Sequence, residues 1–201
     1  MSNLIYKNAI VTDEWALVEL PKADQEVRKQ AGKVVLFKLT GEKSTSAEQI
    51  ANTVIPATGK VIVPLSVYLA RKDALASRIA KQEVGVWLAT HELLEDLISA
   101  EKDLNVLPLI AVYVERFADG RIFTIGNLLR TRHGFNNTLR AFGDVLRDQL
   151  YFLKRSGFDC YLVRADRNAA EALQSLTDFN QPYQGAVDDN LPVWRRVNRG
   201  A

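Results

Sequence analysis

Short apolar runs recur at nearly constant spacing from residue 60 onward, and this regularity constrains the fold more than any other feature. The runs centre on Ile62, Val86, Ala111, Leu139 and Leu162, so the successive intervals are 24, 25, 28 and 23 residues. Between the runs lie apolar residues at helical spacing. A strand followed by a helix at such intervals is typical of βα units, which form parallel sheets covered by helices.

We therefore expect an α/β protein whose mostly parallel sheet has about five to six strands in βα units. So few strands cannot close an eight-stranded barrel within one chain, and this favours an open, doubly wound sheet. A partial βα barrel, or a barrel that a second copy completes in a homodimer, is the alternative. The runs show no sequence similarity to one another, so the regularity belongs to the architecture and not to a repeat protein.

The first 40 residues have a different pattern, because they are typical of strands. Leu4–Val11 and Trp15–Leu20 flank Thr12–Glu14, which predicts an N-terminal β-hairpin, and Val34–Leu39 predicts a further strand. We expect a single α/β domain over residues 1–201. Its parts are a β-rich segment at 1–40, βα units over 60–178 and an irregular C-terminal tail at 180–201.

Charge and the rare residue types limit the chemistry. The 26 basic and 24 acidic side chains give a net charge of +2, whereas a dedicated nucleic-acid or membrane binder is usually far more basic. Cys160 is the only cysteine, and His91 and His133 lie far apart in sequence. These residues cannot ligate an iron–sulfur cluster or a structural zinc ion.

We therefore expect no metal site and no cofactor, with a flavin held without a glycine motif as the open alternative. The N-terminus has no signal-peptide pattern, and no apolar run approaches the roughly 20 residues that a bilayer requires. The sequence therefore predicts a cytoplasmic protein that binds neither membranes nor nucleic acid.

Arginine is dense in the part of the chain where a ligand site is expected. In an open parallel sheet, ligands bind outside the carboxyl ends of the strands. From Arg116 to Arg155 there are eight basic and three acidic residues. Helix N-termini with unpaired amides converge at the same edge of such a sheet. Arginine beside a helix N-terminus suits a small oxyanion such as phosphate, sulfate or sulfite.

Two turns in this stretch are expected to shape an anion-binding cleft. Asp119-Gly120 permits a tight turn after one strand, and Gly143 permits close backbone approach after the next. Successive strands of parallel folds are often neighbours, so the two loops should face each other. The predicted anion-binding residues are Arg121, Arg140, Asp144, Arg147, Gly120 and Gly143.

The acids of the same stretch supply a competing interpretation. Asp144 and Asp148 can pair with the arginines and leave no charge for a ligand. The residue types identify no catalytic group, so the sequence does not decide whether the protein is an enzyme.

Longer motifs in this region resemble a known bacterial family. They are Asp119-Gly120-Arg121, the continuous run Leu139–Leu150 and Gly157-Phe158-Asp159, and the likeness extends to Asp13-Glu14-Trp15 and Gly85–Leu88. The chain resembles the family named domain of unknown function 934. Members of that family are often labelled "oxidoreductase probably involved in sulfite reduction".

The resemblance implies a place in sulfate and sulfite assimilation and assigns no residue a role. Reduction of sulfite transfers several electrons and needs a haem, a cluster or a flavin. We therefore expect an accessory protein of assimilatory sulfite reduction that binds a small oxyanion or sulfite reductase itself. The alternatives are an enzyme acting on a small phosphorylated or sulfur-oxyanion substrate, and a flavin- or nicotinamide-dependent oxidoreductase.

Overall fold

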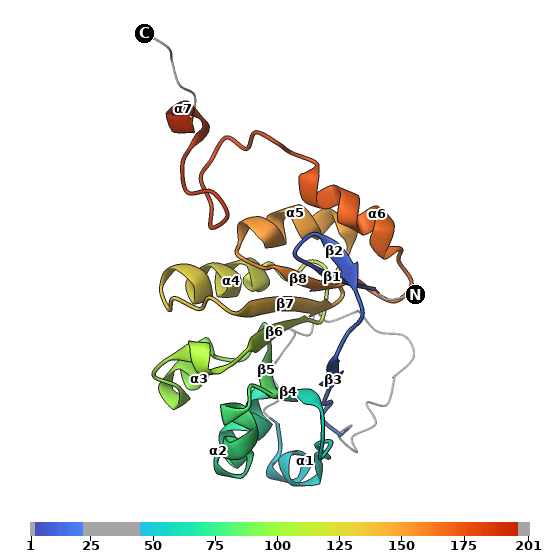
Figure 1. Cartoon of the computed structure of the whole chain (residues 1–201), viewed down its shortest axis with the longest axis vertical. Coiled ribbons are helices and arrows are strands. Elements are labelled where there is room, and N and C mark those ends of the chain that lie inside the picture. The colour runs from blue at the N-terminus through green and yellow to red at the C-terminus, as the bar shows by residue number, and fades with distance from the viewer. Residues whose placement is uncertain (1–2, 22–44, 197–201) are drawn as a thin grey trace, which may run out of the picture.

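A curved eight-stranded sheet with helices along its outer side organises the molecule (Figure 1). The computed structural model describes residues 3–21 and 45–196. The strands are β1 (Leu4–Tyr6), β2 (Ala9–Val11), β3 (Trp15–Leu17), β4 (Lys60–Pro64), β5 (Val84–Ala89), β6 (Leu109–Val114), β7 (Thr138–Gly143) and β8 (Cys160–Leu162). The α-helices are α1 (Ala47–Asn52), α2 (Leu65–Ala80), α3 (Leu94–Ala100), α4 (Arg121–Thr131), α5 (Arg147–Arg155), α6 (Ala169–Gln174) and α7 (Val193–Arg196), with 3₁₀ turns at η1 (Leu104–Val106) and η2 (Ser175–Thr177).

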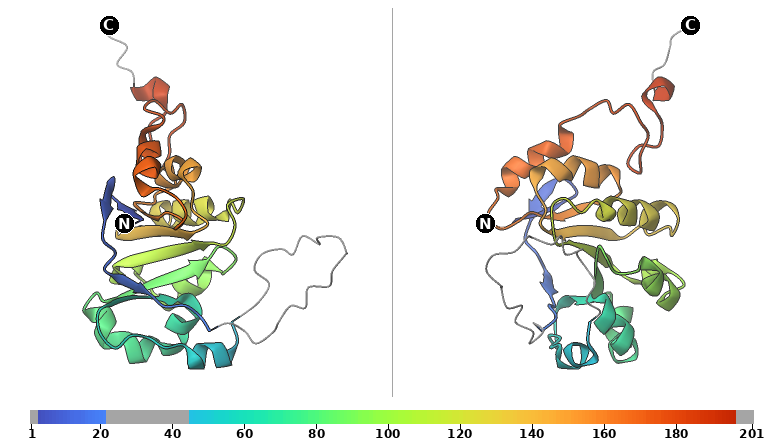
Figure 2. Two further views of the ribbon diagram at one scale, coloured as in Figure 1. Left: turned by 90° about the vertical axis from the view of Figure 1, so that its right-hand side faces the viewer. Right: turned by 180° about the vertical axis from the view of Figure 1, so that it is seen from behind.

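Strand order decides between the two arrangements that the sequence left open. The order across the sheet is β2-β1-β8-β7-β6-β5-β4-β3, so from β4 to β8 each strand lies beside the next strand of the chain. A doubly wound sheet reverses its order at a switch point, and this sheet does not. Connections that all run in one direction place their helices on one face, as Figures 1 and 2 show for α2 to α5. The fold is therefore the partial βα barrel, curled into half a barrel.

The regular spacing of apolar runs is confirmed as strand spacing. The five runs form β4, β5, β6, β7 and β8, and helices occupy the segments between them. Strand β3 joins the edge beside β4 in parallel orientation, which brings the parallel strands to the upper end of the expected range. At the other edge, β1 pairs antiparallel with both β8 and β2.

The N-terminal hairpin is present, but it lies earlier in the chain than predicted. Strands β1 and β2 are joined by Lys7 and Asn8, whose φ angles of 45° and 65° suit a tight hairpin turn. The predicted second arm, Trp15–Leu20, instead supplies β3 to the opposite edge of the sheet. Residues 12–14 therefore span the open side of the half barrel. The strand predicted at Val34–Leu39 lies outside the described residues.

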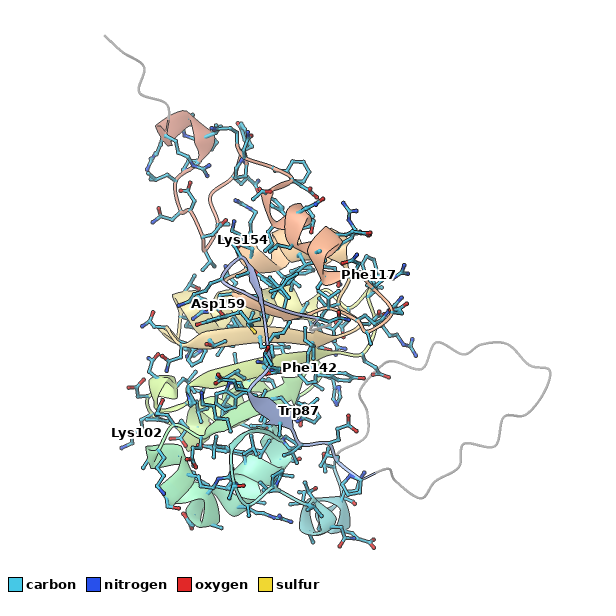
Figure 3. All side chains as sticks on the ribbon, turned by 45° about the vertical axis from the view of Figure 1, so that its right-hand side comes forward. Trp87, Lys102, Phe117, Phe142, Lys154 and Asp159 are labelled. Atoms are coloured by element: carbon cyan, nitrogen blue, oxygen red, sulfur yellow. The ribbon has the colours of Figure 1, made fainter. Side chains whose placement is uncertain are left out.

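Side chains alternate along the strands, and so the sheet has two different faces. The outer face packs against the helices in one large apolar core, which includes Val86, Ile110 and Ala141. The concave face has a smaller cluster in which Trp87, Tyr113 and Phe142 pack with ring centroids 5.2–6.0 Å apart. Figure 3 labels Trp87 and Phe142 of this cluster. The concave face therefore carries aromatic surface of its own.

The C-terminal segment leaves the sheet after η2 and ends at α7, away from the strands (Figure 2). It contains little regular structure before α7, in keeping with its lack of periodicity. Within residues 3–21 and 45–196, no helix combines the length and apolar character that crossing a bilayer takes.

Candidate functional site

At the carboxyl edge of the sheet, Arg121 is bound by its own neighbour. Its Nε and Nη2 atoms donate to the two carboxylate oxygens of Asp119 at 2.9 and 2.6 Å. The hydroxyl of Thr90 donates to the same carboxylate. The hydrogen bond from Arg121 lowers the pKa of Asp119 to about 2. The competing interpretation of a paired arginine thus applies to Arg121, with Asp119 as the acid in place of Asp144 or Asp148.

Asp144 ties the loops of this edge together and does not begin α5. Its carboxylate accepts hydrogen bonds from the Phe117 amide at 2.9 Å and from Nη1 of Arg164 at 2.6 Å. The preceding Gly143 has φ +100°, and an added Cβ atom would lie 2.3 Å from the carbonyl oxygen of Val114. The close approach expected at Gly143 is therefore present, and it serves the packing of two strand ends.

Two more of the predicted residues, Arg147 and Gly120, have weaker connections to a site. Arg147 is exposed at the start of α5 and lines a pocket of about 230 Å³ together with Arg167, Asp148 and Glu171. The two acids balance the two arginines, so the charges that line this pocket do not favour an anion. Gly120 has an ordinary right-handed backbone, and a Cβ atom added to it would meet no atom within 4 Å.

Arg140 lies in a different place from Arg121, which corrects the expected single cleft. It is the third residue of β7, where it pairs in register with Ala111 of β6 and Cys160 of β8. Alternation turns its side chain onto the concave face, on the same side as Phe142. The residue is 4% exposed. Arg140 was expected at the carboxyl edge because the strand around Leu139 was expected to end before it. In the structure this strand, β7, continues to Gly143.

The partner of Arg140 comes from the segment that crosses the open face. Nη1 and Nη2 donate to the two carboxylate oxygens of Asp13 at 2.9 and 3.0 Å, and Nε lies 3.3 Å from the sulfur of Cys160. The neighbouring Glu14 pairs with Lys60 at 2.8 Å. Both acids of residues 12–14 are thus held by cations of the concave face. Because 127 residues separate Asp13 and Arg140, no local sequence pattern predicts this pair.

These side chains line a pocket of about 400 Å³ at the amino ends of the strands. Tyr6 and Thr138 contribute hydroxyl groups that lie 3.5 Å apart. Arginine has five N–H groups, and Asp13 and Cys160 use three of those of Arg140. The other two have no partner among the described residues. Asp13 therefore offsets the charge of Arg140, as Asp119 does for Arg121, and the guanidinium keeps two N–H groups for a ligand of this pocket.

A family comparison covers most of this structure. The model of the family described as "Bacterial protein of unknown function (DUF934)" matches residues 85–194, more than half of the chain. The chain belongs to this family. No curated protein matches it. The matched region of this DUF934 protein includes Arg140, Cys160 and the carboxyl-edge network, whereas Asp13 and Glu14 precede it.

Cys160 of this DUF934 protein is a buried thiol and not a reactive one. Burial raises its pKa to about 11, against an opposing effect of Arg140. The thiol therefore stays protonated at neutral pH, although a thiolate is the nucleophilic form. Across residues 3–21 and 45–196, no three histidine, cysteine or acidic side chains are grouped so that they could hold a metal ion.

Proposed function

We propose that this DUF934 protein is a cytoplasmic accessory protein of assimilatory sulfite reduction that binds a small oxyanion in the concave pocket. The pathway rests on the family resemblance of the Gly143–Gln149 run. The oxyanion rests on Arg140, whose side chain is 5% exposed and lines the pocket. A guanidinium in a partly dehydrated pocket binds tetrahedral and pyramidal oxyanions through more than one oxygen.

The arrangement favours binding over catalysis. The acids of the pocket are engaged, Asp13 with Arg140 and Glu14 with Lys60. The Cys160 thiol is protonated at neutral pH. A general base must be able to accept a proton from the ligand, and the described lining residues provide no carboxylate or thiolate free to do so.

Calorimetric titration with sulfite, sulfate and phosphate tests the binding. Arg140→Lys keeps the charge and loses the planar fork, so we expect it to weaken binding at least about tenfold. The double variant Asp13→Asn/Arg140→Met removes both charges together and should abolish binding while the protein stays folded. Arg132→Met removes an exposed arginine of another surface and is the matched control. Equal affinities for wild-type protein and the Arg140 variants would refute the oxyanion proposal.

Growth on defined sulfur sources tests the pathway separately. A strain that lacks the gene should grow on sulfide and fail on sulfate and on sulfite, and the wild-type gene should restore growth. Growth of the deletion strain on sulfite at the parental rate would refute the accessory role and leave the binding measurements unaffected.

A specific surface favours sulfite reductase as a second candidate ligand. Phe152, Phe179, Tyr183 and Trp194, on α5 and the C-terminal segment, are between 50% and 69% exposed. Phe152 and Phe179 each pack against Tyr151, and Tyr183 packs against Trp194. Exposed aromatic surface marks protein contacts. We propose that these four exposed side chains, called the aromatic patch, contact the reductase.

Co-purification of the two proteins tests this contact. We expect Trp194→Ala and Phe179→Ala to reduce recovery of the reductase, and the exposed Leu93→Ala, outside the patch, to leave it unchanged. If the same variants instead convert a dimer of this protein into a monomer, the patch joins two copies and the reductase contact is refuted.

A further inference from the structure

A second pocket lies between α5 and the C-terminal segment, apart from the concave face. Its volume is about 260 Å³, and it is lined by α5, η2 and residues from Phe179 to Arg196. The rings of Tyr151 and Phe179 form one wall, with centroids 4.9 Å apart. Figure 3 labels Lys154, which lies on the α5 side of this pocket. The pocket is large enough for a small ligand.

Two buried polar groups of this pocket lack partners among the described residues. Tyr151 is 8% exposed, and its hydroxyl oxygen is buried without a hydrogen bond. Nη2 of Arg196 is likewise buried and unbonded, whereas Nε of the same side chain pairs with Asp189 at 2.9 Å. Buried polar groups in folded proteins are nearly always hydrogen-bonded. Both residues line this pocket, so an acceptor bound within it is the partner that the two groups lack.

The charges of the pocket favour an anionic acceptor. Asp188 pairs with Arg155 at 3.5 Å, and Asp189 pairs with Arg196. The ammonium group of Lys154 has only a long bond of 3.4 Å to the carbonyl oxygen of Leu176, and no acid partner within the described part of the chain. Lys154 therefore leaves the pocket with positive charge that its own acids do not neutralise.

We infer that this pocket is a binding site for a small oxyanion group, such as a phosphate, sulfate or carboxylate. The Tyr151 hydroxyl, the Lys154 ammonium and the Arg196 guanidinium donate to its oxygens, and Phe179 packs against any apolar part of the ligand. The inference does not depend on the oxyanion proposed for the concave pocket, because it uses none of the residues of that pocket. It shares only Phe179 with the proposed reductase contact, and the measurement of anion binding does not need the reductase. A bound ligand joins α5 to the C-terminal segment.

NMR titration of the full chain with inorganic phosphate, sulfate and acetate distinguishes the two pockets. The amides of Phe179 and Asn180 report on this pocket, and the amide of Thr138 reports on the concave one. Phenyl phosphate, which carries the same anion on an aromatic ring, separates a free ion from an organic ligand. Tighter binding of phenyl phosphate than of phosphate assigns an organic ligand, and equal binding assigns the ion.

We expect saturable shifts of Phe179 and Asn180 in the wild-type protein with at least one of these probes. Tyr151→Phe removes only the hydroxyl, and Lys154→Gln replaces the ammonium by an uncharged amide. Each should weaken binding at least about tenfold, equivalent to about 1.4 kcal/mol.

The matched controls change the same chemical groups elsewhere. Tyr113→Phe alters a half-buried tyrosine of the concave aromatic cluster that lines neither pocket, and Lys102→Gln alters the exposed lysine after α3 that Figure 3 also labels. Both should bind like the wild-type protein. Shifts confined to Thr138, or equal affinities for Tyr151→Phe and wild-type protein, would overturn the inference.

Discussion

The pair between Asp13 and Arg140 should stabilise the fold by an amount that can be measured. The side chain of Arg140 is 5% exposed and that of Asp13 is 28% exposed. Removing one partner of a buried pair costs about 3–5 kcal/mol, and exposed pairs are worth less than about 1 kcal/mol. Because Asp13 is partly exposed, we expect Asp13→Asn to lower the free energy of unfolding by about 2–3 kcal/mol. For a chain of this size, that loss lowers Tm by about 5–10 °C.

A double-mutant cycle measured by urea unfolding isolates the pair from its surroundings. The cycle compares Asp13→Asn, Arg140→Met and the double variant, and we expect a coupling energy of about 2 kcal/mol between the two sites. Glu14→Gln is the matched control, because Glu14 and Lys60 are 71% and 45% exposed. Its cost should be much smaller than that of Asp13→Asn, because solvent screens an exposed ion pair. A coupling energy under about 0.5 kcal/mol would refute the reasoning, as would a Glu14→Gln variant that is as unstable as Asp13→Asn.

Three further outcomes follow from the described geometry. Gly143→Ala should lower the free energy of unfolding by at least about 3 kcal/mol, because its backbone is left-handed and its Cβ atom would meet the Val114 carbonyl, whereas Gly120→Ala should stay within about 0.5 kcal/mol in the same urea experiment. Cys160, with a pKa of about 11, should react with a thiol-specific chromogenic disulfide at pH 8 only as fast as the protein unfolds, and rapid labelling of the native protein would contradict its burial. The pKa of Asp119 falls from an ordinary 3.8 to about 2 on folding, so the ionised carboxylate stabilises the folded state fully above pH 4, and this stabilisation is lost as pH falls towards 2. The free energy of unfolding of Asp119→Asn, measured against pH, should lack this loss. Identical acid profiles for the wild-type protein and the variant would count against the prediction.

The strands and helices after residue 60 could be predicted because their signal is local. Each apolar run is a buried strand, and each has a helix of matching period behind it, so no distant information is needed. The order of strands in the sheet is not local, since the same runs fit a doubly wound sheet and a half barrel equally well. The hairpin was displaced for a related reason. Trp15–Leu17 has the alternation of a hairpin arm, but its partner is β4 and not β2.

The candidate site could be predicted only in part. The density of arginine made Arg121 and Arg140 candidate site residues, and both form close ion pairs. Which acid each would bind was not predictable, because Asp13 and Arg140 are 127 residues apart in the sequence. A charged residue inside an apolar strand was the available signal for the concave pocket. Arg140 lies two positions from Phe142 on the same face, and such a residue must find a buried partner.

Towards each edge of the sheet, strands pair that the ribosome synthesises at different times. Leu4 of β1 pairs with Leu162 of β8, while Trp15 of β3 pairs with Lys60 of β4. At typical rates of translation, on the order of 10–30 s separate the synthesis of β1 from that of β8. Throughout this interval the hairpin has no sheet to join. Residues 12–14 can therefore reach their final path only after β8 has emerged, and closure of the concave pocket becomes a late step of biogenesis.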